Sequence, residues 1–147
     1  TVSAATEAAI MGFPSMAVSL DTHKEADFTF AAKFARKMTR VILHHREQLL
    51  GSAINVNVPC LPRDKIKGVV VVRQAQTNIV EYFEKRTDPR ENTYYWFAGE
   101  SSSATRQKDT DVGALTSGFI TVTPIHFDLT RHDLLDALKA VVKQNIF

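Results

Sequence analysis

The sequence has few of the features that covalent cross-links or membrane attachment require. It contains one cysteine, Cys60, which excludes a disulfide within the chain and fits a reducing compartment. No apolar run approaches the roughly 18 residues of a membrane span, and no basic start followed by an apolar core marks a signal peptide. These absences predict a cytoplasmic protein that has no membrane partner.

An excess of charge of one sign is also missing. Lys and Arg number 18 against 16 Asp and Glu, so the net charge is only +2. Cations such as Lys33, Arg36, Lys37 and Arg40 are scattered among helical positions. A nucleic-acid polymer usually requires a denser basic stripe with exposed aromatics. We therefore expect no nucleic-acid partner, although a modest phosphate-bearing ligand is compatible with this charge.

Residue patterns for metal binding and nucleophilic catalysis are weak. The histidines show no His-x-x-x-His or Cys/His spacing, and Cys60 has no basic neighbour that would activate its thiol. Thr1 could act as a nucleophile with its own amine as base, but such threonines normally begin a strand and this one begins a helix. Thr1 and Ser3 suit anion binding instead, because the amino end of a helix has unpaired N–H groups. The residues alone identify no reaction.

The sequence does contain a series of periodic segments separated by turn residues. Its 147 residues are 44% hydrophobic and 23% charged, which is ordinary for one globular domain. Helices are predicted over 1–11, 25–50 and 110–115 and from 128–130 onward, and strands over 15–20, 54–58, 67–73, 79–85, 93–97 and 119–123. This order predicts an α/β fold with a β-rich extension.

Several local signals within these segments make specific predictions. The unbroken valines of 69–72 indicate a strand buried on both faces. Pro124 is expected to end the strand 119–123. Thr110 is expected to cap the short helix 110–115. Thr130 and Asp133 resemble a capping box at the start of the last helix. That helix has an apolar face made of Leu134, Leu135, Leu138, Val141 and Val142.

The segment 87–96 joins a polar turn to three consecutive aromatics, Tyr94, Tyr95 and Trp96. Side chains alternate along a strand, so these rings lie on both of its faces. The pattern indicates an interface, and the alternative is a strand buried on both sides within one domain. A second pair, Asp128 and His132, either holds the last helix across a subunit boundary or is an exposed local contact of little energy.

Several stretches occur in an order that is specific to one protein family. They are 1–5 with 12–20, 54–59 (Ile-Asn-Val-Asn-Val-Pro), 66–68, 87–90 with 94–96, 110–111, 118–124 and 128–130. Together they span nearly the whole chain. On these residues the sequence resembles the C-terminal part of the SurE survival-protein nucleotidases.

This resemblance implies a metal-dependent phosphatase that removes the 5′ or 3′ phosphate from nucleoside monophosphates. It implies a three-layer Rossmann-like sheet, of which 1–75 form the C-terminal half. It further implies that 76–147 form a hairpin, a loop and a swapped C-terminal extension that assemble a homodimer or homotetramer. For that assembly we expect contacts from Tyr94, Tyr95, Trp96, Asp128 and His132.

The family pattern also implies what this chain lacks. The ligands of the divalent metal, Mg²⁺ or Mn²⁺, lie upstream of a threonine that corresponds to Thr1. We therefore expect Thr1 to help hold the phosphate, and the chain to carry no metal ligand and no catalytic residue. The sequence departs from the family at Ala75, where the family usually reads Arg-x-Gly, and at Glu91, where it usually has glycine in the hairpin turn. Because glycine permits positive φ, we expect Glu91 to reshape that turn.

Two further readings remain open. The chain begins without Met and inside a helix pattern, which predicts a processed chain or the back part of a longer one. The segment could alternatively be an inactive oligomerisation module. An intact mass above 16.4 kDa would show a longer protein.

Overall fold

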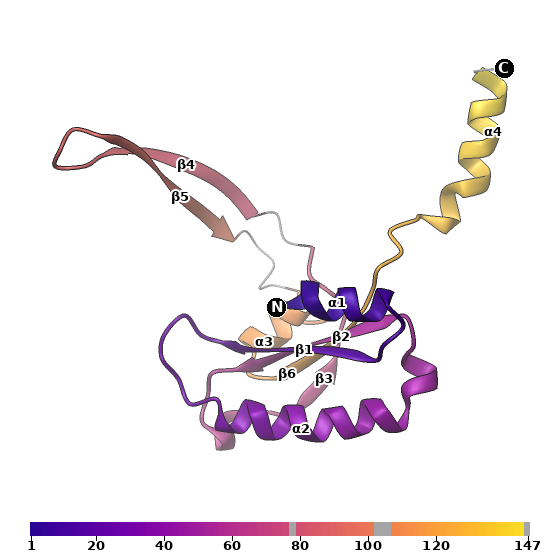
Figure 1. Cartoon of the computed structure of the whole chain (residues 1–147), viewed down its shortest axis with the longest axis horizontal. Coiled ribbons are helices and arrows are strands. Elements are labelled where there is room, and N and C mark those ends of the chain that lie inside the picture. Colours follow the sequence, from indigo (N-terminus) through magenta and orange to yellow (C-terminus); the bar gives the residue numbers. More distant parts are fainter. Residues whose placement is uncertain (77–78, 102–106, 146–147) are drawn as a thin grey trace.

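A computed structural model describes residues 1–76, 79–101 and 107–145 of the chain. One four-stranded sheet carries helices on both faces, and a two-stranded hairpin and a terminal helix project from it (Figure 1). The elements are α1 (Val2–Ile10), β1 (Ser15–Asp21), α2 (Thr29–His44), η1 (Arg46–Leu49), β2 (Ser52–Pro59), η2 (Arg63–Lys65), β3 (Val69–Val71), β4 (Ile79–Thr87), β5 (Thr93–Ser101), α3 (Asp111–Thr116), β6 (Ile120–His126), η4 (His132–Leu134) and α4 (Leu135–Asn145). The predicted α/β fold is confirmed.

The main sheet has the strand order β1-β2-β6-β3. β1 and β2 are parallel, β6 is antiparallel to β2, and β3 is parallel to β6. The prediction that Pro124 ends this last strand is wrong, because β6 continues to His126 with Pro124 opposite Ile54. β3 pairs with β6 only as far as Val122, so in the described structure the later part of β6 is paired on one side alone, by β2. Proline is tolerated at such a strand edge because no neighbour needs its missing N–H.

The two faces of the sheet bury different kinds of side chain. Beneath α2 the core is formed by large aliphatic residues, and Val56 and Val58 are completely buried there. Beneath α1 the contact is made by small residues, with Ala5 and Ala9 packed on Ala17 and Ala53. Each fully buried valine stabilises the fold by about 1.5–3 kcal/mol. The three layers, helix, sheet and helix, therefore follow from the alternation of side chains along the strands.

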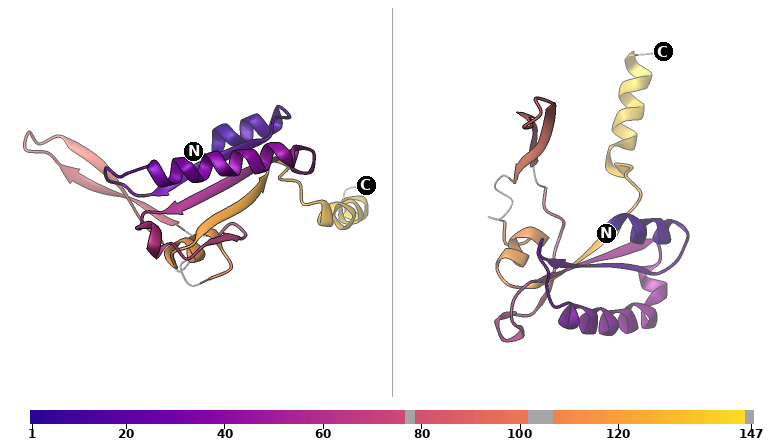
Figure 2. Two further views of the ribbon diagram at one scale, coloured as in Figure 1. Left: turned by 90° about the horizontal axis from the view of Figure 1, so that it is seen from below. Right: turned by 60° about the vertical axis from the view of Figure 1, so that its left-hand side comes forward.

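Two element predictions need correction in length or burial. The second helix spans 29–44 rather than 25–50, and it begins where the Asp27 carboxylate accepts a 2.8 Å hydrogen bond from the Thr29 N–H. β3 is short, and Val69 and Val71 are 51% and 74% exposed. The prediction of burial on both faces is therefore wrong. The reason is its place at the sheet edge, where α2 does not extend over it (Figure 2).

The hairpin is confirmed, with Thr87 opposite Thr93 at its turn. Glu91 does not reshape this turn, because it adopts the left-handed conformation itself, with φ at +66°. The Thr110 cap of α3 is also confirmed, since its hydroxyl accepts a 3.2 Å hydrogen bond from the Gly113 N–H. The loop expected after the hairpin falls partly on 102–106, which lie outside the described residues.

The capping box predicted for the last helix is absent from the structure. A short 3-10 turn, η4, precedes α4, and its N-cap residue is Arg131, which makes no side-chain capping bond. The Asp133 carboxylate pairs with Arg131 at 2.6 Å instead of reaching back to the chain at Thr130. The capping-box pattern is wrong because two short-range charge contacts compete with it. Within the described ranges, no helix is long and apolar enough to cross a bilayer.

Candidate functional site

The amino end of α1 and the carboxyl ends of β1 and β2 lie at one edge of the sheet. A tight connection over residues 11–14, with Gly12 at φ +83°, reverses the chain between α1 and β1. α1 therefore runs antiparallel to β1 and begins at the end where β1 finishes (Figure 1). Ligands of open α/β sheets bind outside the carboxyl ends of the strands. This edge is the candidate functional site.

Thr1 occupies the N-cap position of α1 at this edge. Its side chain is exposed and makes no capping hydrogen bond, and no acidic residue lies in the first turn. The first N–H groups of the helix are therefore not neutralised by side chains, which favours an anion at this end. The structure thus places Thr1 where a phosphate could bind. Phosphate binding by Thr1 remains a prediction.

A row of amide and hydroxyl side chains lines the sheet face on the α1 side. The Asn57 amide donates a 3.5 Å hydrogen bond to the Thr121 hydroxyl, which links β2 to β6. Ser15 Oγ, Asn55 Oδ1 and Thr123 Oγ1 are buried and have no hydrogen-bond partner within the described residues. Orphaned buried polar atoms cost free energy, so such a row indicates a function or bound water. The three orphaned groups are buried beneath α1 and α3 and are closed to a ligand, whereas the half-buried Asn57, nearer the carboxyl end of β2, can contact a phosphate or a ribose.

The sequence contained this row without revealing its role. The alternation Ile54-Asn55-Val56-Asn57-Val58 predicted a strand with one polar face, and that part is confirmed. A polar face normally indicates solvent, whereas Asn55 and Thr123 are buried here. Their burial depends on α1 and α3, which pack on this face from segments far away in the chain. Local periodicity carries no signal for that packing.

The start of α3 braces the stretch of chain that directly follows β3. One Asp111 carboxylate oxygen accepts 2.8 Å hydrogen bonds from the N–H groups of both Ala75 and Val112. The Arg73 guanidinium bonds to Asp109 at 2.9 Å and lowers the pKa of that carboxyl. The sequence pattern predicts a helix cap at Thr110 and does not connect the neighbouring aspartates with the chain at residues 73–75. The connection spans more than thirty residues, so no local pattern reports it.

The resemblance implied a divalent metal, and the described residues do not fit one. Within them, no three His, Cys, Asp or Glu side chains come together in a way that could hold an ion. Mg²⁺ and Mn²⁺ sites are built largely from carboxylates and waters. The candidate edge offers mainly amides and hydroxyls instead. No catalytic step is therefore derived through a metal bound to these residues.

The aromatics expected at an interface are exposed on both faces of the hairpin. Tyr94 is 41% exposed, Tyr95 63% and Trp96 53%. The alternative, a strand buried on both sides within this chain, is wrong. Tyr94 and Trp96 share one face, where the Arg86 guanidinium lies 5.1 Å from the Trp96 ring centre. Whether another subunit covers these rings remains a prediction.

Asp128 and His132 form the predicted pair, with 2.6 Å between carboxylate and imidazole. Both side chains are partly or largely exposed, and the contact lies within one stretch of chain before α4. Two contacts lower the pKa of Asp128 well below its ordinary value. The hydrogen bond with Thr130 is the larger cause, and the contact with His132 is the second. The hairpin and α4 project as separate elements (Figure 2), so the structure does not bring this pair to the aromatics.

Comparison with known proteins adds sequence relatives to this geometry. The family described as "Survival protein SurE" matches residues 1–81. A protein of Syntrophus aciditrophicus named 5′-nucleotidase SurE is 52% identical over 98% of this chain and 54% of its own length. Another of that name, from Syntrophobacter fumaroxidans, is 45% identical over 94% of this chain and 55% of its own length. The chain thus spans about half the length of the curated relatives it matches.

A solved structure shows the same fold. The crystal structure of the SurE protein from Aquifex aeolicus matches with a TM-score of 0.75 at 33% sequence identity. The match covers 96% of this chain and 56% of that one. The similarity therefore includes the sheet and the elements that project from it.

Proposed function

The chain belongs to the SurE family, and on this premise we propose that it forms part of a phosphatase that hydrolyses nucleoside 5′- or 3′-monophosphates. The observation that carries the proposal is the 52% identity, over 98% of this chain, to a protein named 5′-nucleotidase SurE. The geometry supports it, because the α1 amino end and the half-buried Asn57 amide lie toward the carboxyl ends of β1 and β2, where a nucleotide would bind.

In this proposal the residues of the chain bind and orient the substrate. The first N–H groups of α1 and the Thr1 hydroxyl hold the phosphate, and the half-buried Asn57 amide contacts the ribose side. A divalent metal, Mg²⁺ or Mn²⁺, held by residues outside this chain, supplies Lewis-acid polarisation and an activated water. An exposed free thiol at Cys60 suits the reducing cytoplasm as the working compartment.

We further propose a division of labour along the chain. Residues 1–75 contribute half of the Rossmann-like sheet, and 76–147 contribute the hairpin, loop and C-terminal extension through which a homodimer or homotetramer forms. Exposed aromatics on β5 and exposed leucines on α4 support the assembly role. β6 and α3 also lie in the second segment and complete the sheet.

The proposal is tested by joining this chain to the part of the Syntrophus aciditrophicus relative that lies outside their match. The joined protein, with Mn²⁺ or Mg²⁺, should release phosphate from nucleoside monophosphates. Thr1→Val should lower kcat/KM about tenfold, because one hydrogen bond to a charged phosphate is lost. Thr116→Val, an exposed matched change on α3, should leave it unaltered. A joined, folded protein without phosphate release would contradict the proposal.

The second candidate is an oligomerisation module without a reaction of its own. The exposed rings of the hairpin and the exposed face of α4 favour it. Sedimentation of the purified chain tests the assembly role separately from the proposed phosphatase role. A stable monomer at micromolar concentration would count against an assembly role, whatever the joined protein catalyses.

A further inference from the structure

α2 carries an unbalanced row of positive charge. Lys33, Arg36, Lys37 and Arg40 repeat at the three- and four-residue spacing of one helix face, and α2 contains no acidic residue. Like charges at this spacing destabilise a helix by a few tenths of a kcal/mol per pair. None of the four forms an ion pair within the described residues. The Asp27 carboxylate before α2 attracts Lys33 without pairing with it, so most of the mutual repulsion of the row remains.

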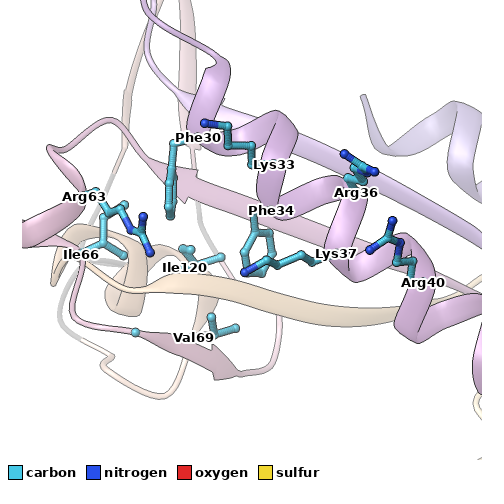
Figure 3. Close-up of a pocket in the computed structure, with 11 residues that line it drawn as sticks. Phe30, Lys33, Phe34, Arg36, Lys37, Arg40, Arg63, Ile66, Val69 and Ile120 are labelled. Carbon is cyan, nitrogen blue, oxygen red and sulfur yellow. The ribbon is translucent and has the colours of Figure 1, made fainter.

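These cations line a groove that a fifth cation closes from the other side. Arg63 of η2 reaches toward Phe30 from across the groove (Figure 3), and it too is unpaired within the described ranges. The cavity has a volume of about 620 Å³, within the size range of small-molecule sites. Charges that the sequence appears to scatter are thus gathered by the fold around one concave surface.

The floor of the groove is apolar and aromatic. Phe30 and Phe34 project from α2 toward Ile66, Val69 and Ile120 (Figure 3). The floor stays open because α2 packs mainly on β1 and leaves the β3 edge of the sheet uncovered. Both phenylalanine rings are only partly buried. The groove therefore offers rings for stacking beside cations for ion pairing.

We propose that this groove binds a nucleoside di- or triphosphate, a small molecule with an aromatic base and several phosphates. The row from 33 to 40 extends about 10 Å along the helix at 1.5 Å per residue, which exceeds the reach of one phosphate group. Guanidinium groups bind phosphate oxygens in pairs, and Arg36 and Arg40 lie one helical turn apart on α2 beside the groove, while Arg63 lies at its Phe30 end (Figure 3). A base stacks favourably on an aromatic side chain such as Phe30.

This site lies on the α2 face of the sheet, whereas α1 covers the opposite face. The inference uses only residues of this chain, and it does not depend on phosphatase activity. A failure to bind a nucleoside triphosphate would leave the proposed function untouched. A failure to release phosphate would likewise leave this site untouched.

Calorimetric titration of the full chain with ATP, in EDTA so that no metal contributes, tests the proposal. AMP should bind at least about tenfold more weakly than ATP, because it meets fewer cations. Lys37→Glu and Arg63→Glu should each weaken ATP binding by about tenfold or more, for the same reason. Lys143→Glu, the same charge change on α4, should alter it less than about twofold. Both groove changes relieve repulsion, so the melting temperature should not fall.

Two further arms identify the ligand class. Inorganic triphosphate should bind more weakly than ATP, and Phe30→Leu should weaken ATP binding while leaving inorganic triphosphate unchanged. Equal binding of both ligands, with no effect of Phe30→Leu, would overturn the nucleotide assignment in favour of inorganic phosphate chains. Tighter binding of a single-stranded oligonucleotide would overturn it in favour of nucleic acid. ATP binding that Lys37→Glu and Lys143→Glu affect equally, or no ATP binding at millimolar concentration, would overturn the site itself.

Discussion

Glu91 holds a backbone conformation that is costly for any residue with a side chain. Its φ of +66° lies in the left-handed region, where an L-residue other than glycine pays about 1–2 kcal/mol. The turn tolerates this because Asp88 organises it, accepting hydrogen bonds from the N–H groups of Arg90 and Asn92 at 2.8 Å each. Several bonds from one carboxylate therefore fix the loop and impose the strain on one residue.

Glu91→Gly should stabilise the hairpin turn by about 1 kcal/mol, because the left-handed conformation then carries no side-chain penalty. Amide hydrogen exchange of the hairpin and urea unfolding measure the gain. Arg90→Gly, one residue earlier and without positive φ, should give no gain. Equal or lower protection in Glu91→Gly would show that the turn is not strained.

Asp128 gives a pH prediction with a definite sign. Its pKa is lowered by Thr130 and then by His132, so its contribution to the order of the segment before α4 is present above about pH 4. That contribution is lost as the pH falls through the lowered pKa. The carboxyl carbon resonance of Asp128 should titrate well below 3.9, and Thr130→Ala should move its midpoint upward. A midpoint at or above the ordinary value would refute the contact.

Single-residue signals in the sequence were reliable where the contact was local. Thr110 caps α3 as its sequence position predicts, because the cap needs only the three residues that follow. Thr130 does not cap α4, because Asp128 two residues earlier and the Arg131–Asp133 pair take the polar groups of that segment. Patterns of residue type predict a cap only where no neighbour competes for the same hydrogen bonds.

At the scale of elements, α3 joins the sheet to the stretch of chain that follows β3. Asp111 carries that connection, since its buried carboxylate accepts from the backbone on both sides. Gly113 allows the close approach, because a Cβ there would lie 2.1 Å from the Gln107 carbonyl oxygen. The position of the chain at Ala75 therefore depends on a six-residue helix.

Asp111→Ala should lower the free energy of unfolding by about 2 kcal/mol, because two buried N–H groups lose their acceptor. Urea unfolding monitored by circular dichroism measures the loss. Asp136→Ala, at an exposed carboxylate on α4, should change stability by less than about 0.5 kcal/mol. Similar losses in the two variants would show that the brace contributes nothing.

Trp96→Ala should weaken assembly before it affects chemistry. The Trp96 ring is exposed in the single chain, and burying such a ring against a partner is worth about 1.5–3 kcal/mol. Sedimentation velocity of the variant over a concentration series measures the shift toward monomer. Phe13→Ala, an equally exposed aromatic beside α1, is the matched control. Loss of turnover in an assembly that stays intact would contradict the assignment.

Element boundaries differ from the sequence prediction where tertiary context decides. The valines of β3 predicted a buried strand, yet β3 lies at an edge that no helix of the described chain covers. Pro124 predicted the end of a strand, yet β6 continues because its partner β2 lies on one side only at that point. Sequence period identifies an element correctly, but its neighbours determine its burial and length.

At the scale of the whole molecule, the chain combines a sheet with two projecting elements whose apolar surfaces are exposed. The hairpin presents aromatic rings and α4 presents Leu138 and its neighbours, while the sheet presents a polar edge beside Thr1. The α/β class and the family were accessible from the sequence, because motif residues are spread along nearly the whole chain. The basic groove was not, because Arg63 meets α2 only through the fold.

The central claim is that this chain binds and orients a nucleotide whose hydrolysis depends on metal ligands outside it. One assay tests it most directly, the release of phosphate from a nucleoside 5′-monophosphate with Mn²⁺. The purified 147-residue chain and the chain joined to the remaining part of the Syntrophus aciditrophicus relative are measured side by side. The account predicts phosphate release by the joined protein and none by the chain alone. Clear turnover by the chain alone, or none by a folded joined protein, would contradict it.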